Sequence, residues 1–391
     1  MTARHPYFAR LQRALHAAEI AGPWMVIDRT RLDENLKRVK QSVPAELAIR
    51  VVAKSLPSPR LLAHVSKALE TDRFMTFNLP MLQAIAREFP NADQMLGKPL
   101  LPAALKRFLR GEHDPSRVQW LADTPQRLAA MEMIAAPAGA TLRVALEINV
   151  GLERGGFEPG PEFRAALETL QRSPSLSFSG LMGYEPHLTH LPDRFGLRKA
   201  AQRESWSRYR KFLEIAAETL GAEAISGAVR NIGGSPTFRL YKDDSLGNEV
   251  ALGSCLVKPT DFDLEPLADL KPACFIAAPV LKTGKTTLPG LGFADPILNA
   301  LAPSSSRTVF LHGGDWQARP VDPPGLRNNK IFGRSPNQEM LNGGRDLALK
   351  PGELVFLRPH KSEAVLLQFG DLAIYDGEKI AERWPVYYAS A

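Results

Sequence analysis

Short apolar runs recur at a regular interval between residues 24 and 232. The early runs begin roughly 20 to 27 residues apart, and helical patterns such as Leu32, Leu36 and Val39 lie between them. Strands that alternate with helices predict a parallel sheet covered by helices. The number of units favours a closed (β/α)8 TIM barrel, with a doubly wound sheet as the alternative. The runs are Trp24–Asp28, Leu47–Ala53, Phe74–Asn78, Gln94–Lys98, Val118–Ala122, Leu142–Val150, Phe178–Glu185 and Ala228–Ile232.

The pattern changes beyond about residue 250. Short apolar segments separated by Gly/Pro-rich turns replace the helical periodicity, which predicts a mostly-β domain after the barrel. A chain of 391 residues with 44% apolar side chains is long enough for a barrel plus an added domain. The segments are Cys274–Leu281, Arg307–Leu311, Glu353–Leu357, Ala364–Phe369 and Asp371–Tyr375.

The charge distribution argues against a nucleic-acid partner. The formal charge is +7, but 49 cationic and 42 anionic residues are interleaved without a basic block. Charges scattered through the first residues leave no export signal, and the longest apolar run, Ala273–Leu281, contains a proline. Two cysteines form neither a disulfide framework nor a metal-binding pattern. We therefore expect a cytoplasmic protein that neither enters a membrane nor binds nucleic acid.

A lysine follows one of the predicted barrel strands. The run Leu47–Ala53 leads directly into Lys54, and prolines then break the chain. The carboxyl ends of barrel strands open into the mouth where active sites lie. Apolar neighbours lower the pKa of a lysine and make its amine nucleophilic. Lys54 is therefore a candidate for forming a Schiff base, although a lone lysine after a strand is more often a solvated end residue.

Three further strand ends carry polar groups. Arg154 lies in a glycine-flanked turn, Tyr184 and His187 follow the next run, and the sequence from Asn231 to Thr237 contains two glycines and a serine. Glycine allows backbone N–H groups to approach a phosphate. Each motif alone is more often structural, since Gly-Gly-Ser-Pro is usually a turn and two histidines without a third ligand are rarely a metal site. Their convergence on one face of one barrel is what indicates an active site.

The ordered set of motifs resembles the fold-type III enzymes that use pyridoxal 5'-phosphate (PLP). Within these enzymes it is most similar to the D-threonine aldolase and D-serine dehydratase branch, often labelled amino-acid deaminase/aldolase. The resemblance implies an alanine-racemase-like barrel over residues 28–250, a β-rich domain formed by 1–27 and 251–391, and a homodimer. It rests on Trp24–Asp28, Arg50–Ser55, Gly151–Gly156, Gly183–Glu185, Gly233–Thr237, Glu249–Ser254 and Trp384–Val386.

The resemblance also implies roles for individual residues. Lys54 matches the lysine that holds PLP as an internal aldimine, and Arg154 matches the arginine beside the ring and its phenolic oxygen. Tyr184 lies where the branch lines the cofactor pocket. The residues placed in or beside the phosphate-binding loops are Asn231, Gly233, Gly234, Ser235, Gly253 and Ser254.

Three positions depart from the branch. Many members hold a divalent metal with a His-x-Cys or His-x-Asp pair near the C-terminus, but here His360 is followed by Ser362, a poor metal ligand. The histidines that flank the lysine in the branch are Val52 and Leu56 here. A metal at His360 is therefore left open, and so is the catalytic base. The candidates for the base are His187, His312, Asp315 and His360, of which we assign His187 together with Lys54.

The function implied is that of a PLP-dependent lyase acting on a small amino-acid substrate. Retro-aldol cleavage of a β-hydroxy α-amino acid would give glycine and an aldehyde. The alternatives are a PLP-dependent amino-acid racemase or a D-serine dehydratase-like deaminase. A non-catalytic PLP-binding protein is the further alternative, and the roughly 140 residues after the barrel count against it because such carriers are usually a barrel alone.

Overall fold

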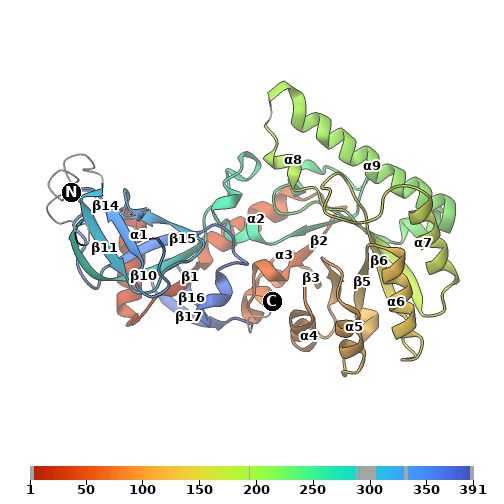
Figure 1. The fold of residues 1–391 in the computed structure, drawn as a ribbon, viewed down its shortest axis with the longest axis horizontal. Helices are drawn as coiled ribbons and strands as arrows, with labels where there is room; N and C mark the ends of the chain where they lie inside the picture. The colour runs from red at the N-terminus through yellow and green to blue at the C-terminus, as the bar shows by residue number, and fades with distance from the viewer. Residues whose placement is uncertain (1–3, 193, 288–289, 291–304, 330–332, 388–391) are drawn as a thin grey trace. The chain divides into compact units, whose positions relative to one another are not determined.

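The computed structural model describes residues 4–192, 194–287, 290, 305–329 and 333–387 (Figure 1). The chain divides into two compact units. The barrel unit is built on Leu36–Leu256 and Leu264–Asp269, and the sheet unit on Met1–Asn35, Val257–Asp263 and Leu270–Tyr388. The domain boundaries expected from the sequence, 28–250 against 1–27 with 251–391, stay a prediction.

Eight strands close the barrel, and every neighbouring pair is parallel. This confirms the (β/α)8 fold and excludes the doubly wound sheet. Seven of the expected apolar runs supply strands, and Glu249–Leu252 closes the ring between the strands at Val229 and Ala48. The strands are β2 Ala48–Val52, β3 Arg73–Thr76, β4 Asp93–Leu96, β5 Val118–Ala122, β6 Leu142–Glu147, β7 Leu176–Met182, β8 Val229–Ile232 and β9 Glu249–Leu252.

The helices of the barrel unit begin at clear start signals. Ser58, Asn78 and Thr124 each accept a backbone N–H in the first turn of a helix that carries proline there. Buried leucines and valines recur on one face, as in Leu61, Leu62 and Val65. The helices are α2 Arg29–Ser42, α3 Pro59–Leu69, α4 Leu79–Glu88, α5 Pro102–Leu109, α6 Pro125–Ala135, α7 Pro161–Arg172, α8 His187–His190, α9 Leu197–Leu220, α10 Ala222–Ser226 and α11 Ser254–Val257.

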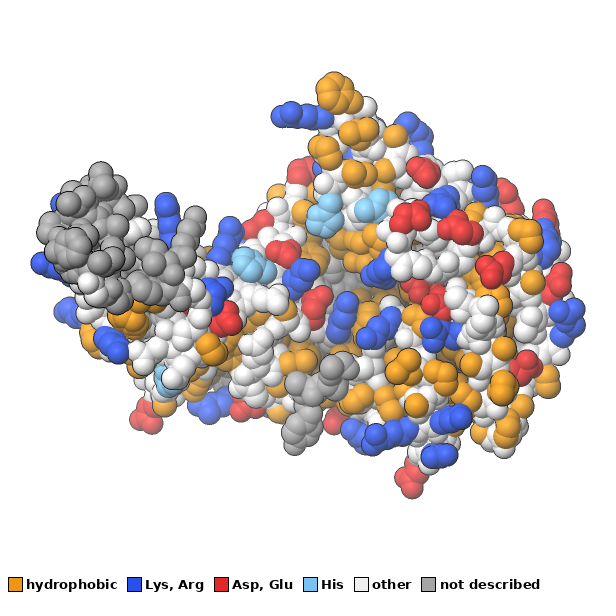
Figure 2. Space-filling view, in the orientation of Figure 1, with side chains coloured by type: hydrophobic (Ala, Val, Ile, Leu, Met, Phe, Trp, Pro, Cys, Tyr) orange, Lys and Arg blue, Asp and Glu red, His pale blue; other side chains and the backbone are white. Residues whose placement is uncertain are grey.

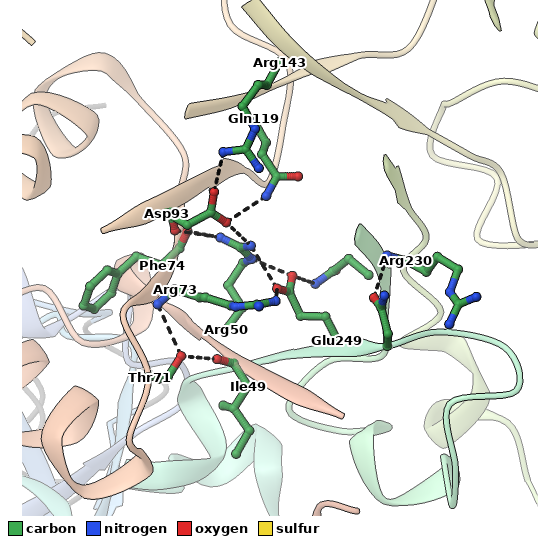
Figure 3. Close-up of polar contacts among 12 residues, drawn as sticks. Ile49, Arg50, Thr71, Arg73, Phe74, Asp93, Gln119, Arg143, Arg230 and Glu249 are labelled. Atoms are coloured by element: carbon green, nitrogen blue, oxygen red, sulfur yellow. Dashed lines mark hydrogen bonds and ion pairs between the residues drawn. The ribbon is translucent and has the colours of Figure 1, made fainter. Parts of the chain in front are cut away.

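A buried ionic network, here called the barrel floor, fills the amino-terminal end of the barrel (Figure 3). The guanidinium of Arg50 is fully buried and lies between two carboxylates. Its Nε is 2.6 Å from Glu249 Oε1 and its Nη2 is 2.6 Å from Asp93 Oδ2. Arg143 and Gln119 also donate to Asp93, and Arg73 donates to Glu249. Because Asp93 and Glu249 begin their strands, the floor lies opposite the strand ends that carry the predicted site.

The sheet unit holds a nine-stranded sheet. Its long central strand, β10 Cys274–Lys285, pairs antiparallel with β1 Trp24–Asp28, and β1 also pairs parallel with β16 Asp371–Tyr375. The first apolar run therefore belongs to this sheet, as the resemblance implied. The other strands are β11 Arg307–Leu311, β12 Ala318–Asp322, β13 Arg327–Asn328, β14 Met340–Gly343, β15 Leu354–Pro359 and β17 Ile380–Pro385.

Helix α1 (Pro6–Ala17) packs its apolar face on this sheet, with Tyr7, Leu11 and Leu15 in one buried cluster with Phe275 and Phe356. One expected segment differs from its prediction. Ala364–Phe369 is not a strand, because the chain forms a short 3-10 helix at Leu366–Phe369 that ends at Gly370 with φ 72°. Within the described residues, no helix combines the length and hydropathy needed to cross a lipid bilayer.

Candidate active site

Lys54 lies immediately beyond the carboxyl end of β2. It belongs to the single 3-10 turn Ala53–Ser55, and its side chain is half-buried. The ammonium nitrogen lies 4.3 Å from the ring centroid of Phe77, a residue that follows β3. The lysine therefore lies over an aromatic face at the mouth of the barrel, where the sequence predicted it.

Ser55, the residue next to the lysine, is hydrogen-bonded to a serine just beyond the strand that closes the barrel. Ser254 Oγ, just after β9, donates a hydrogen bond to Ser55 Oγ at 2.8 Å. Gly253 lies against the same turn, since a Cβ built on it would be 2.8 Å from the Val52 carbonyl oxygen and 3.0 Å from Ser55 Cβ. Glycine is required at 253 because only a residue without a side chain allows this close approach.

Ser235 connects the loop after β8 to the loop after β9. Its hydroxyl oxygen accepts the backbone N–H groups of Gly253 at 2.9 Å and Cys255 at 3.2 Å. Accepting two N–H bonds leaves the hydroxyl its own hydrogen to donate. Three serine hydroxyls, those of Ser235, Ser254 and Ser55, thus converge at the ends of β8, β9 and β2. This donor set, which has little side-chain bulk, fits a phosphate group.

The loop Gly233–Thr237, here called the glycine loop, is packed against Tyr184. A Cβ at Gly234 would lie 2.5 Å from Tyr184 Cε2, so glycine is needed for the ring to lie there. The N–H groups of the two glycines bond within the protein. Gly233 N donates to Glu185 Oε2 at 3.4 Å, and Gly234 N donates to Thr237 Oγ1 at 3.0 Å. The glycines therefore shape the loop, and the serines carry the donors.

Arg154 and Tyr184 are brought together as predicted. The guanidinium carbon lies 5.3 Å from the centroid of the Tyr184 ring, and Nη2 lies 3.9 Å from Oε1 of Glu147 at the end of β6. Burial raises the pKa of Glu147, against the opposing attraction of Arg154. The Arg154 side chain is 55% exposed, so it can still reach a ligand at the mouth.

His187 begins the short helix α8 and lies against the loop that carries Arg154. A Cβ at Gly151 would be 3.6 Å from His187 Nε2. Its Nδ1 is buried and has no hydrogen-bond partner among the described residues. Burial lowers the pKa of His187, while the charges of Glu204 and Glu153 act in the opposite direction. The imidazole is therefore neutral at neutral pH.

Asn231 occupies a different place from the other predicted residues. Its side-chain amide donates to Glu249 Oε1 at 2.8 Å, which makes it part of the barrel floor network. Its backbone carbonyl accepts bonds from Gly183 N and the Tyr209 hydroxyl. Asn231 connects the floor to the loops above it, and its contact with a cofactor stays a prediction.

The remaining candidates belong to the sheet unit. Nδ1 of His360 lies 2.7 Å from the Thr260 hydroxyl, and the buried Ser362 hydroxyl donates to Glu363. His312 lies near Gly22, and Asp315 pairs with Arg334 at 3.9 Å. In the part of the chain that the structure describes, no group of three or more His, Cys, Asp or Glu could hold a metal ion. These residues do not fit the metal site that the branch would imply at His360.

One residue of this site was missed by the sequence reasoning. Glu185 lies inside the quoted motif Gly-Tyr-Glu-Pro-His, yet only the tyrosine and the histidine were assigned. Its carboxylate is buried beneath the glycine loop and accepts the Thr237 hydroxyl at 2.7 Å. A charged residue directly after an apolar strand was the available signal. On the face shown in Figure 2, cationic and anionic side chains intermingle.

Comparisons with known proteins identify the family and the fold. The model of the family described as alanine racemase, N-terminal domain, matches residues 27–261. A search of curated proteins returned no match. A D-threonine aldolase from Filomicrobium marinum is 17% identical with a TM-score of 0.75, covering 94% of this chain and 97% of that one.

Two other solved structures share the fold. A D-threo-3-hydroxyaspartate dehydratase from Delftia sp. HT23 is 16% identical with a TM-score of 0.71, covering 95% of this chain and 98% of that one. An alanine racemase from Clostridium difficile 630 is 13% identical with a TM-score of 0.68, covering 93% and 98%. At these identities the likeness shows a common fold.

Proposed function

The chain belongs to the alanine racemase N-terminal domain family, and on that premise we propose that it is a PLP-dependent lyase. The proposed substrate is a β-hydroxy α-amino acid, cleaved between Cα and Cβ to glycine and an aldehyde. The observation that carries the proposal is the 2.8 Å bond between Ser254 and Ser55. It ties the residue beside Lys54 to a cluster of anion-binding donors, and a cofactor with an aldehyde and a phosphate needs both.

The cofactor would be held at both ends by residues of the barrel unit. Lys54 would attach it covalently, and the hydroxyls of Ser235 and Ser254 would hold its phosphate. The N–H groups of Gly253 and Cys255 fix the Ser235 oxygen in place. PLP, when bound, withdraws electrons from a bond broken at Cα of the substrate. Arg154 and Tyr184, together at the mouth, would orient the ring.

The protein must also take a proton from the substrate hydroxyl. We assign this step to His187, whose lowered pKa keeps the imidazole neutral and able to accept a proton. Arg154, which pairs with Glu147 at 3.9 Å and is 55% exposed, is a cation at the mouth that can bind a substrate carboxylate. No step is assigned to a metal, since the described donors do not form a site for one.

Borohydride reduction with PLP, followed by peptide mapping, tests the cofactor assignment. We expect one pyridoxyl adduct, on Lys54. Lys54→Ala should lose both the adduct and the visible absorption band of bound PLP, because no other amine lies in this turn. Lys67→Ala, which removes an exposed lysine from α3, is the matched control and should keep both. An adduct on another lysine would overturn the assignment.

Product analysis tests the reaction. Incubation with β-hydroxy amino acids should release glycine and an aldehyde, and His187→Ala should slow the release by about 10²- to 10⁴-fold, the usual contribution of a general base. An inverted substrate would identify a racemase, and a keto acid with ammonia would identify a dehydratase, as expected for relatives of the alanine racemase and the hydroxyaspartate dehydratase. Binding of PLP without turnover of any of these substrates would identify a non-catalytic carrier.

A further inference from the structure

Glu185 is a buried carboxyl group that the proposed reaction does not use. Its side chain is 2% exposed, and it follows β7 between Tyr184 and the start of α8. Two donors bond to it. Thr237 donates its hydroxyl at 2.7 Å and Gly233 donates its N–H at 3.4 Å. The nearby Tyr241 hydroxyl also acts to lower the pKa of the carboxyl group.

These bonds fix the glycine loop on the side where Glu185 lies. Gly233 N donates directly to Oε2 of Glu185. Gly234 N donates to the Thr237 hydroxyl, which in turn donates to Oε1. One carboxyl group therefore orients both glycines and turns their N–H groups away from the front of the loop. Ser235, between Gly234 and Thr237, is left facing the N–H groups of Gly253 and Cys255.

The neighbours of Glu185 bring no compensating charge. Tyr241, beyond the 3-10 turn Phe238–Leu240, and Tyr209, on α9, are the titratable groups that face it. Both are neutral phenols, since burial raises the pKa of each. Arg230 and Glu249 act on Tyr209. The largest contributions that favour a negative charge at Glu185 are hydrogen bonds.

We propose that Glu185 is a positioning residue for the phosphate-binding loops and that it takes up a proton when they bind a phosphate dianion. This inference rests on the proposed function. Glu185 and the phosphate would lie on opposite sides of the same five-residue loop, so two negative charges would repel each other through a protein interior of low dielectric. Protonation of Glu185 removes that repulsion. Burial raises the pKa of Glu185 to about 7, which makes the proton available near neutral pH.

Glu185→Gln in the full chain tests the proposal, because glutamine has the shape of the protonated acid and carries no charge. The dissociation constants of PLP and of pyridoxal, which lacks the phosphate, are measured by absorbance titration between pH 6 and pH 9. At pH 6 the two proteins should bind PLP equally. At pH 9 the wild type should bind PLP about tenfold more weakly than the variant. Pyridoxal should show no such difference, because it brings no charge to the loop.

Two further measurements keep the test independent of how well the variant folds. Calorimetry of the wild type in buffers of different ionisation enthalpy should show more proton uptake with PLP than with pyridoxal at pH 8, and the excess should vanish in Glu185→Gln. Thr237→Val should weaken PLP binding at every pH without removing the pH dependence, since it breaks the link to Gly234 but keeps the carboxyl group. Glu168→Gln on the surface of α7 is the matched control.

The outcomes separate the two proposals. PLP profiles that run parallel in wild type and Glu185→Gln would overturn the role of Glu185 and leave the PLP site standing. A wild-type chain that binds neither PLP nor pyridoxal would overturn the proposed function itself.

Discussion

At the scale of single residues, the site depends on two glycines, because a side chain at either position would collide with a neighbouring group. Gly253 and Gly234 occupy positions where a Cβ would lie 2.8 Å from the Val52 carbonyl oxygen and 2.5 Å from Tyr184 Cε2, respectively. Both contacts are shorter than real Cβ atoms make, so any other residue would push the strand ends or the ring aside. The polar groups of the site converge because these two positions carry no side chain.

Gly234→Ala should displace the Tyr184 ring from its position near Arg154. We expect a loss of about 1–3 kcal/mol in the free energy of unfolding, the usual cost of overpacking, together with weaker PLP binding. Urea denaturation and PLP titration check both effects.

The matched controls for this prediction are one other glycine and one double variant. At Gly227, where φ is −81°, a Cβ would lie 3.7 Å from the Glu223 carbonyl oxygen, an ordinary contact, so Gly227→Ala should be neutral. In a Tyr184→Ala background, Gly234→Ala should cost much less, since the ring that it would strike is gone. An equal cost in both backgrounds would contradict the proposed contact.

At the scale of elements, the parallel barrel separates its two polar ends. The carboxyl ends of β2, β8 and β9 carry the candidate site, and the amino ends of β4 and β9 carry the barrel floor. Forming the barrel floor costs desolvation free energy, because Arg50 and Glu249 are fully buried and each must neutralise the charge of the other. The apolar pattern of the strands predicted the barrel but gave no sign that Arg50 points into it.

Arg50→Met should destabilise the barrel strongly. The substitution leaves the carboxylate of Glu249 buried with hydrogen bonds from Arg73 and Asn231. Breaking a buried pair in this way costs about 3–5 kcal/mol. Urea denaturation followed by circular dichroism measures the loss. Arg172→Met, in an ion pair whose arginine is 73% exposed, is the control and should change stability by less than about 1 kcal/mol. Equal effects of the two substitutions would show that the floor is not a stabilising network.

At the scale of the whole molecule, we propose that the chain works as a homodimer, as its resemblance to fold-type III enzymes implies. Light scattering after gel filtration should give about twice the chain mass of 43.0 kDa at micromolar concentration. The Lys54→Ala variant should also give the mass of a dimer, because the lysine lies at the mouth of its own barrel. A single species at the mass of one chain would contradict the proposal.

The repeat of apolar runs was enough to predict the barrel and the strand ends where polar groups gather. The reason is physical: period and strand length are local properties, and parallel strands bring their carboxyl ends to one face wherever they pair. The positions of Lys54, Arg154, Tyr184 and Ser235 beyond the strand ends could therefore be predicted from the sequence, and their roles stay predictions. The apolar run at Ala364–Phe369 could not be assigned in this way, since a short run fits a strand and a helical turn equally well.

Partnerships between residues far apart in the chain were decided only by the tertiary structure. Trp24–Asp28 has the same apolar pattern as the barrel strands, so the pattern alone did not separate it from them. The resemblance implied the other domain, and pairing with β10 and β16 places the run in that sheet. Glu185 meets Thr237, and Arg50 meets Glu249, across 52 and 199 residues. Burial of a charge depends on which partners the closed barrel brings to it, and no local pattern in the sequence records that.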